Sequence, residues 1–147
     1  MGSSELQRLY QQVILDHSRE RHGFGLKDGA AAESHQVNPT CGDQLTLRVH
    51  LDGDTVRELS WEGEGCSISM ASASLLADLA RGIAVAELPA RIELFRELMH
   101  SRGAGVADDE PLGDAAVLEG VSKYVARVKC AMLAWVALEH DLAQLAR

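Results

Sequence analysis

The sequence predicts an α+β protein in which helices cover one face of a small antiparallel sheet of about three strands. Residues 43–51 alternate between apolar and polar side chains, a turn signal follows them, and the segments after Cys66 repeat apolar residues at helical spacing. Alternation with period two is typical of a half-buried strand, and recurrence every three or four residues is typical of an amphipathic helix. Because the strands stand together between one early helix and several later ones, the order favours the α+β class.

The first element is a predicted helix over residues 4–18. Ser4 is a favourable N-cap because its hydroxyl can accept a hydrogen bond from a free backbone N–H, and apolar residues recur behind it at helical spacing. Residues 19–40 are polar and rich in glycine, so we expect them to be mostly loop. Asn38-Pro39 predicts a turn immediately before Cys41.

Two strands follow this turn. The first is expected over residues 43–51, and its apolar face carries Leu45, Leu47, Val49 and Leu51. Asp52-Gly53-Asp54 is a hairpin signal. The second strand contains Val56, Leu59 and Trp61, and the glycine-rich segment 62–65 is expected to break it.

Four further segments show helical patterns. One begins after Cys66 and ends at Gly82, because glycine commonly terminates helices. A second covers residues 88–99 and a third covers residues 117–128, with a glycine- and aspartate-rich loop at 101–113 between them. The last helix is expected from about Lys129 to Leu145. Its first half is apolar on almost every side, which predicts a central position in the core.

Length, composition and charge restrict the class of protein. The 147 residues, 46% of them hydrophobic, suit one domain over residues 1–147. A net charge of −8 disfavours nucleic acid as a partner, because phosphate-binding surfaces are basic. The longest apolar run, residues 131–138, is far shorter than the roughly 20 residues of a membrane span. The N-terminus lacks the pattern of a secretory signal, so we expect a cytoplasmic protein with no membrane partner.

The three cysteines are candidate metal ligands, although a free cysteine is more often a small buried apolar residue. In Cys41-Gly42-Asp43, an extended backbone would direct the thiolate and the carboxylate to the same side, and Gly42 would leave room for a close approach. Cys66 precedes a predicted helix, whose free N–H groups favour a thiolate. Cys130 follows two basic residues near the start of another helix.

Together, three thiolates and one carboxylate could supply four tetrahedral ligands for zinc. Arg127 and Lys129 could neutralise part of the excess negative charge. The spacing contains no pair of cysteines two residues apart, so it is not that of an ordinary zinc finger. None of the six histidines adjoins a cysteine, and His35 is the best rival as the fourth ligand.

Four segments of the chain resemble the U-type iron–sulfur assembly proteins, the family that includes IscU, SufU and the N-terminal part of NifU. The similar segments are Leu9–His17, Asn38–Asp43, Gly65–Ser74 and Arg127–Leu133, and they follow one another in the same order as in that family. The resemblance covers nearly the whole chain, and it implies the same α+β fold.

Two departures from the IscU pattern match the SufU branch. Lys129 stands where IscU proteins have a histidine before the third cysteine, and the stretch around residues 85–113 is longer than in IscU. SufU-type proteins bind zinc and accept persulfide sulfur from a cysteine desulfurase. The resemblance therefore implies that Cys41, Asp43, Cys66 and Cys130 bind zinc. It further implies that Cys41 accepts the sulfur and that Arg127 is a basic residue at the catalytic site.

The resemblance implies a SufS-type cysteine desulfurase and downstream iron–sulfur assembly proteins as partners. Three alternatives stay open at this point. The same residues could bind iron or hold a [2Fe–2S] cluster, since thiolates are its usual ligands. Zinc could instead be purely structural. A cysteine-dependent hydrolase is a weaker alternative, because no histidine is suitably placed.

Overall fold

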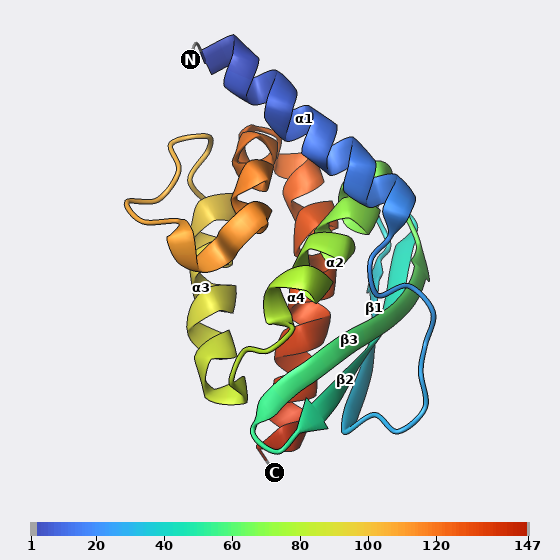
Figure 1. Ribbon diagram of the computed structural model, residues 1–147. Coiled ribbons are helices and arrows are strands. Elements are labelled where there is room, and N and C mark those ends of the chain that lie inside the picture. Colours follow the sequence, from blue (N-terminus) through green and yellow to red (C-terminus); the bar gives the residue numbers. More distant parts are fainter. Residues whose placement is uncertain (1–2, 147) are drawn as a thin grey trace.

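The computed structural model describes residues 3–146 and contains one three-stranded sheet against which the helices pack (Figure 1). The sheet consists of β1 (Ala32–Asn38), β2 (Asp43–Asp52) and β3 (Thr55–Glu64), all antiparallel, with β2 in the middle. Helix α4 (Val125–Leu145) packs on β1 and β2, and helix α2 (Ser67–Ala80) packs on β3. This arrangement has the predicted α+β architecture.

The predicted alternation of β2 is confirmed. Leu45, Leu47 and Val49 are completely buried on the face that meets the helices, while the intervening residues are partly or fully exposed. The alternation ends at His50, which is also buried and whose Nε2 lies 2.7 Å from the buried Ser60 hydroxyl. A bulge between His50 and Leu51 then shifts the register with β3. Burial of one face thus accounts for the strand signal in this segment.

Strand β1 lies inside the segment that was expected to be mostly loop, so that expectation was wrong for residues 32–38. β1 is an edge strand. Its ends, Ala32 and Asn38, are buried, but its middle consists of polar or exposed side chains that carry no apolar alternation. Strand β3 also extends past the expected break, because residues 63 and 64 pair with Leu45 and Gln44.

The helices surround the inner face of the sheet in two groups. Helix α1 (Ser3–Glu20) lies across α2 (Ser67–Ala80) and extends past the end of the sheet (Figure 1). Helix α3 (Leu88–Met99), which follows the short 3-10 helix η1 (Val85–Glu87), packs on the longer 3-10 segment η2 (Glu110–Lys123). Helix α4 (Val125–Leu145) lies in the centre.

The expected helix over residues 117–128 is wrong, because two different elements share this segment. Residues up to Lys123 belong to η2, which is kinked at Gly113 with a φ of 54°. Tyr124 then adopts an extended conformation that separates η2 from α4. Helix α4 starts at Val125 rather than near Lys129, so Cys130 lies in its second turn.

A buried hydrogen-bond chain connects α2 to α4 in the core. The indole N–H of Trp135 donates to the hydroxyl of Ser72 over 3.0 Å, and that hydroxyl donates to the carbonyl of Ala131 over 2.6 Å. The Trp135 ring also stacks on Phe95, with 3.9 Å between centroids. Because buried polar groups are costly when unpaired, this chain fixes the two helices relative to each other. None of the helices within residues 3–146 combines the length and apolar character needed to cross a membrane.

Candidate metal centre

A tight turn between β1 and β2 carries Cys41. The backbone N–H groups of Cys41 and Gly42 donate to the carbonyl of Asn38 over 3.3 and 2.9 Å. Gly42 has a φ of +74°, a conformation that glycine adopts without steric cost. The expectation of an extended backbone with a close approach at Gly42 was therefore wrong, since no atom would lie within 4 Å of a Cβ there. The turn leaves Cys41 exposed.

Asp43 is the first residue of β2 and is only 2% exposed. Its Oδ1 accepts a hydrogen bond from the backbone N–H of Cys66 (3.3 Å), and its Oδ2 accepts one from the Ser69 hydroxyl (2.5 Å). The Sγ of Cys66 lies 3.8 Å from the same Oδ2. A Cβ on Gly65 would lie 2.9 Å from Asp43 Cγ, so Gly65 is the glycine that permits the close approach.

The remaining thiols come from two helices. Cys66 is the N-cap residue of α2, and Cys130 lies fully buried in α4, next to the Ala131 carbonyl that Ser72 of α2 contacts. The Sγ atoms of Cys130 and Cys41 are 3.6 Å apart. One ligand atom each from Cys41, Asp43 and Cys130 lies within 4.8 Å of the other two, and Cys66 adjoins this group through Asp43. The structure thus groups three of the four predicted donors, and it places Cys66 beside Asp43 at the edge of this group.

Two of the spacings between these donors are close to those expected around a tetrahedral zinc ion. Two sulfurs at about 2.3 Å from a tetrahedral ion are roughly 3.8 Å apart, and a sulfur and an oxygen are roughly 3.5 Å apart. The corresponding distances here are 3.6 Å between Cys130 and Cys41 and 3.8 Å between Cys66 and Asp43. Three soft thiolates and one carboxylate are also a donor set that zinc accepts.

The thiols of Cys66 and Cys130 have opposite pKa shifts. Burial acts to raise the pKa of Cys66, but hydrogen bonds from the Ser69 side chain and from the N–H groups at the start of α2 outweigh it, and the net pKa is lowered. Burial, followed by hydrogen bonds with Asp43 and Cys41, raises the pKa of Cys130 to about 12. These shifts favour the thiolate at Cys66 and the thiol at Cys130.

Arg127 is the basic side chain beside these sulfurs. Attraction to Cys66, a hydrogen bond with Cys66 and attraction to Cys130 raise the pKa of the guanidinium. Its side chain is open to solvent, as is that of Lys129. His35, the rival fourth ligand, lies on β1 and bonds through Nδ1 to the Thr46 hydroxyl over 2.8 Å. Among residues 3–146, no histidine belongs to the donor group that contains Cys41.

The sequence indicated no part in the metal site for Ser69 or Gly65. Ser69 lies in the first turn of α2, where its hydroxyl reaches both Asp43 Oδ2 and Cys66 Sγ, the latter at 3.5 Å. The available signal for Ser69 was its position three residues after the helix-capping Cys66, because side chains three residues apart lie on the same side of a helix. For Gly65 no local signal distinguishes the close contact, since its partner is 22 residues earlier in the chain.

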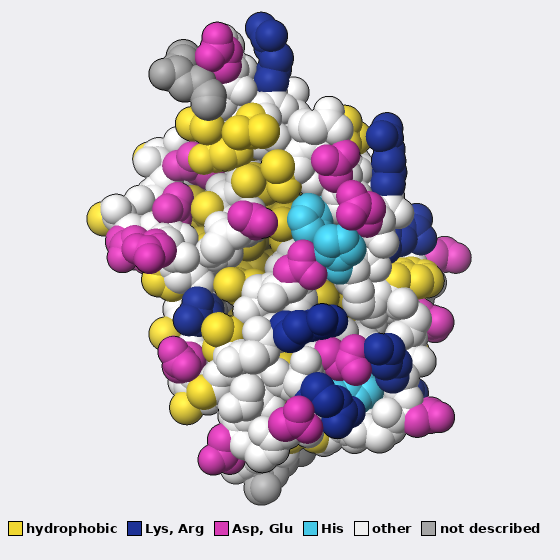
Figure 2. All heavy atoms as spheres, in the orientation of Figure 1, with side chains coloured by type: hydrophobic (Ala, Val, Ile, Leu, Met, Phe, Trp, Pro, Cys, Tyr) yellow, Lys and Arg dark blue, Asp and Glu magenta, His cyan; other side chains and the backbone are white. Residues whose placement is uncertain are grey.

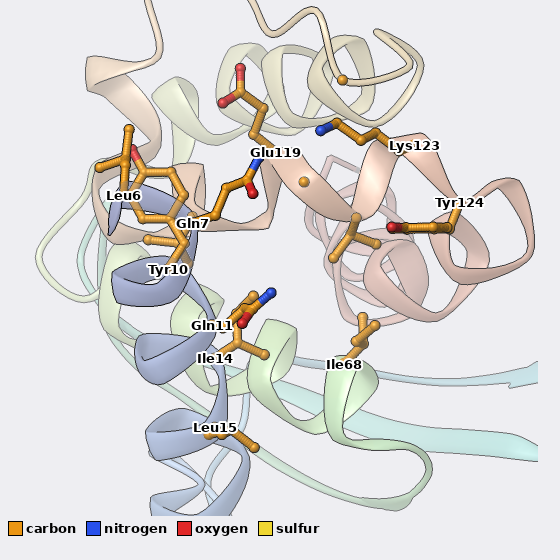
Figure 3. A pocket seen from close by; sticks show the side chains of 14 residues that line it. Leu6, Gln7, Tyr10, Gln11, Ile14, Leu15, Ile68, Glu119, Lys123 and Tyr124 are labelled. Carbon is orange, nitrogen blue, oxygen red and sulfur yellow. The ribbon is translucent and has the colours of Figure 1, made fainter. Parts of the chain in front are cut away.

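A groove of about 580 Å³ lies beside the metal centre but is not lined by any cysteine. Figure 3 shows Leu6, Tyr10 and Ile14 of α1 on one side of it and Ile68 and Tyr124 on the other. Ile68 is only two residues from Cys66, and Tyr124 immediately precedes α4. The groove is therefore mainly apolar and contains none of the four candidate donors.

Comparisons with known proteins show the family to which the chain belongs. A family model described as the NifU-like N-terminal domain matches residues 9–131. The chain is 42% identical over 143 residues to the zinc-dependent sulfurtransferase SufU of Bacillus subtilis, across 97% of this chain and 95% of that relative. It is 38% identical over 142 residues to the iron–sulfur cluster assembly scaffold protein IscU of Streptococcus pyogenes, across 97% and 87%.

A crystal structure of the N-terminal part of a NifU-like protein from Brucella abortus superposes with a TM-score of 0.83. The two chains are 22% identical, and the match covers 93% of this chain and 94% of the other. At this identity the likeness shows the fold alone. It confirms the α+β class that the order of elements predicted.

Proposed function

The chain belongs to the family of NifU-like N-terminal domains, and from this premise we propose that it is a zinc-dependent sulfurtransferase that carries persulfide sulfur for iron–sulfur cluster assembly. One observation carries the proposal: an exposed Cys41 thiol meets buried donors at distances that suit zinc. A site made to clamp the fold has no need of an exposed ligand, whereas a sulfur acceptor must be reached by its donor.

In this proposal Asp43, Cys66 and Cys130 hold the zinc ion, and Cys41 is the ligand that leaves. A bound zinc ion keeps its thiolate ligands deprotonated at neutral pH and moderates their nucleophilicity. Asp43 is oriented by Ser69 and by the N–H of Cys66, and Cys130 is fixed within α4. Cys41 stands on a turn instead, so it can move with little disturbance to the strands.

The transfer step conserves electrons and follows thiol–disulfide exchange. The Cys41 thiolate attacks the outer sulfur of the persulfide on the desulfurase cysteine. The new bond forms between Cys41 Sγ and this outer sulfur, the old sulfur–sulfur bond breaks, and its electron pair leaves with the desulfurase thiolate. Arg127, beside Cys66 and Cys130, stabilises negative charge on the sulfurs during the exchange.

The partners of this chemistry are a cysteine desulfurase of the SufS type and downstream iron–sulfur assembly proteins. The net charge of −8 favours basic docking surfaces on such partners. We place the reaction in the cytoplasm, because three free cysteines are maintained in a reducing compartment.

A scaffold function is the second candidate, since the relative from Streptococcus pyogenes is named as an IscU scaffold. Three thiolates and a carboxylate can also bind iron or a [2Fe–2S] cluster. Lys129 disfavours this alternative, because it replaces a potential histidine ligand with a side chain that is exposed and cationic.

Intact-protein mass spectrometry after incubation with a desulfurase and cysteine tests the proposal. We expect the zinc-loaded protein to gain the mass of sulfur, and peptide mapping should locate it on Cys41. Cys41→Ser should gain none, with circular dichroism unchanged because residue 41 is exposed. His100→Gln, at the exposed end of α3, is the matched control and should gain sulfur like the wild type.

Two results would contradict the proposal. Absence of added sulfur on the wild-type chain would exclude a carrier. Sulfur retained only after iron is added, together with the visible absorption of a cluster, would favour the scaffold function instead.

A further inference from the structure

A second group of metal-binding side chains lies toward the opposite end of α2 from Cys66. One ligand atom each from His17, His22 and Asp78 lies within 4.8 Å of the other two. His17 is in the last turn of α1, His22 follows that helix, and Asp78 is near the C-terminus of α2. Figure 2 shows adjoining histidine side chains bordered by acidic ones on this face. The proposed sulfur chemistry uses none of them.

Ser74 of α2 orients both histidines. The Nδ1 of His17 and the Ser74 hydroxyl are 2.7 Å apart, and that hydroxyl also accepts a hydrogen bond from the backbone N–H of His22 over 2.9 Å. Ser74 is completely buried, and His17 is 9% exposed. The tautomer with its proton on Nδ1 donates to Ser74 and leaves the lone pair of Nε2 free. Hydrogen bonding of one ring nitrogen in this way is typical of metal-binding histidines.

The backbone of His22 is fixed on both sides. Its N–H is bonded to Ser74, and its carbonyl accepts a hydrogen bond from the indole N–H of Trp61 over 2.8 Å. The preceding residue, Arg21, has a φ of 49°, which non-glycine residues rarely adopt. This strained turn directs the chain back over α2 and places the His22 ring beside Asp78. Strain of this kind persists only where the surrounding structure enforces it.

The His22 ring lies between two carboxylates. Its Nδ1 is 2.7 Å from Asp78 Oδ2, and its Nε2 is 3.1 Å from Glu20 Oε1. Hydrogen bonds to Asp78 and Glu20 raise the pKa of His22. The side chains of Asp78 and Glu20 are 50% and 60% exposed, so small ions can reach them from solvent.

We propose that His17, His22 and Asp78 form a second, sulfur-free binding site for a first-row divalent transition-metal ion such as Zn²⁺. The ion takes the place of the proton between His22 Nδ1 and Asp78, and this proton is released to solvent. His17 Nε2 is the third donor, and water completes the coordination. Glu20 keeps its hydrogen bond to His22 Nε2–H, which orients the ring.

The donor chemistry restricts the ion. Two imidazoles and one carboxylate suit zinc, nickel or copper, whereas magnesium and calcium prefer oxygen donors alone. On a tetrahedral ion, nitrogen and oxygen donors are roughly 3.3 Å apart, so Asp78 needs to move back from its present 2.7 Å. Its exposed side chain is free to do so. The bound ion would join the end of α1 to α2.

Equilibrium dialysis of the full-length, zinc-loaded protein against Zn²⁺, with metal counted by mass spectrometry, tests this site. We expect the wild type to bind one more zinc ion per chain than His22→Gln and Asp78→Asn, each of which should bind the second ion at least about tenfold more weakly. His140→Gln, an exposed histidine on α4, should match the wild type. Melting curves without metal check that each variant is folded.

Cobalt distinguishes this site from the cysteine centre. Co²⁺ bound to thiolates has intense near-ultraviolet charge-transfer absorption, whereas Co²⁺ on nitrogen and oxygen has only weak visible bands. The second equivalent of Co²⁺ should add weak bands alone, and both variants should remove them. The proposal is overturned if the wild type binds a single ion even at millimolar zinc, or if either folded variant retains the second ion with unchanged affinity.

Discussion

The two ends of α2 carry two donor clusters of opposite chemical character. At its N-terminal end, Cys66 and Ser69 help to assemble a cluster of three sulfurs and one buried carboxylate. Toward its C-terminal end, Ser74 and Asp78 meet two imidazoles, and the carboxylates there are half exposed. One helix thus contributes residues to a cluster with soft sulfur donors and to a second cluster with harder nitrogen and oxygen donors.

The two clusters differ in what competes with a metal ion for their donor atoms. In the sulfur cluster, burial raises the pKa of Cys130 to about 12, so a metal ion must displace a strongly held proton but then meets little water. In the imidazole cluster, hydrogen bonds to Asp78 and Glu20 raise the pKa of His22, so a metal ion must displace a proton there too, and solvent reaches these carboxylates. We therefore expect tight binding at the first cluster and weaker, readily exchanged binding at the second.

Cys130→Ser should have the largest effect. Loss of one buried thiolate ligand should weaken zinc binding at the cysteine centre by about a thousandfold, or roughly 4 kcal/mol. Because Cys130 is not part of the other cluster, metal binding at His17, His22 and Asp78 should not change. A competitive chelator titration measures the first affinity, and dialysis measures the second. A parallel loss at both clusters would show that they are not independent.

Asp141→Asn should separate the stability of the shared scaffold from metal binding at either cluster. Asp141 is fully buried, and neither carboxylate oxygen has a hydrogen-bond partner among the described residues. Burial raises the pKa of Asp141 from 3.8 to about 7. The Ser34 side chain acts to lower this pKa, and repulsion from Glu33 acts to raise it. The folded protein therefore holds this proton more tightly than the unfolded chain does.

The sign of the effect follows from this difference. The contribution of Asp141 to wild-type stability is greatest below pH 4, falls as the pH rises from about 4 to 7, and is level above that range. Relative to the wild type, Asp141→Asn should gain about 3 kcal/mol between pH 4 and pH 8. Urea unfolding at the two pH values measures this gain, and an equal difference at both would contradict it.

Ser69→Ala and Ser74→Ala form a matched pair on the same helix. Each removes a hydroxyl that orients ligands without binding metal itself, and such partners typically contribute about tenfold or more to affinity. Ser69→Ala should weaken only the cysteine centre, and Ser74→Ala should weaken only the histidine cluster. Zinc dialysis of both variants checks the crossover. Weaker zinc binding at the other cluster in either variant would indicate a general disturbance of α2.

Arg127→Gln should have the smallest effect. Its guanidinium attracts the sulfurs of Cys66 and Cys130 from an exposed position, so solvent weakens the interaction. Sulfur loading of Cys41 should slow by no more than about fivefold, and added salt should reduce the difference from the wild type. Lys129→Gln, two residues away and also exposed, is the control and should load at the wild-type rate. Equal slowing in both variants would deny Arg127 a specific role.

The sequence by itself determined the elements whose cause is local. Burial of one face of β2 leaves an alternation that can be read directly, and the helix ending near Met99 has its full apolar period. Cys41, Asp43, Cys66 and Cys130 could be proposed as partners because their residue types and their resemblance to a known family are properties of the sequence.

Only the tertiary structure decided the features that depend on distant neighbours. Strand β1 exists because β2 offers a partner, although its own side chains carry no strand pattern. Position 65 needs glycine because Asp43 approaches it closely, and position 42 favours glycine because its turn has a positive φ. The sequence alone does not show which of these two reasons applies to which glycine. His17 and Asp78 are 61 positions apart, and they meet because α1 packs across α2. Local preference acts over a few residues, whereas packing joins segments at any separation.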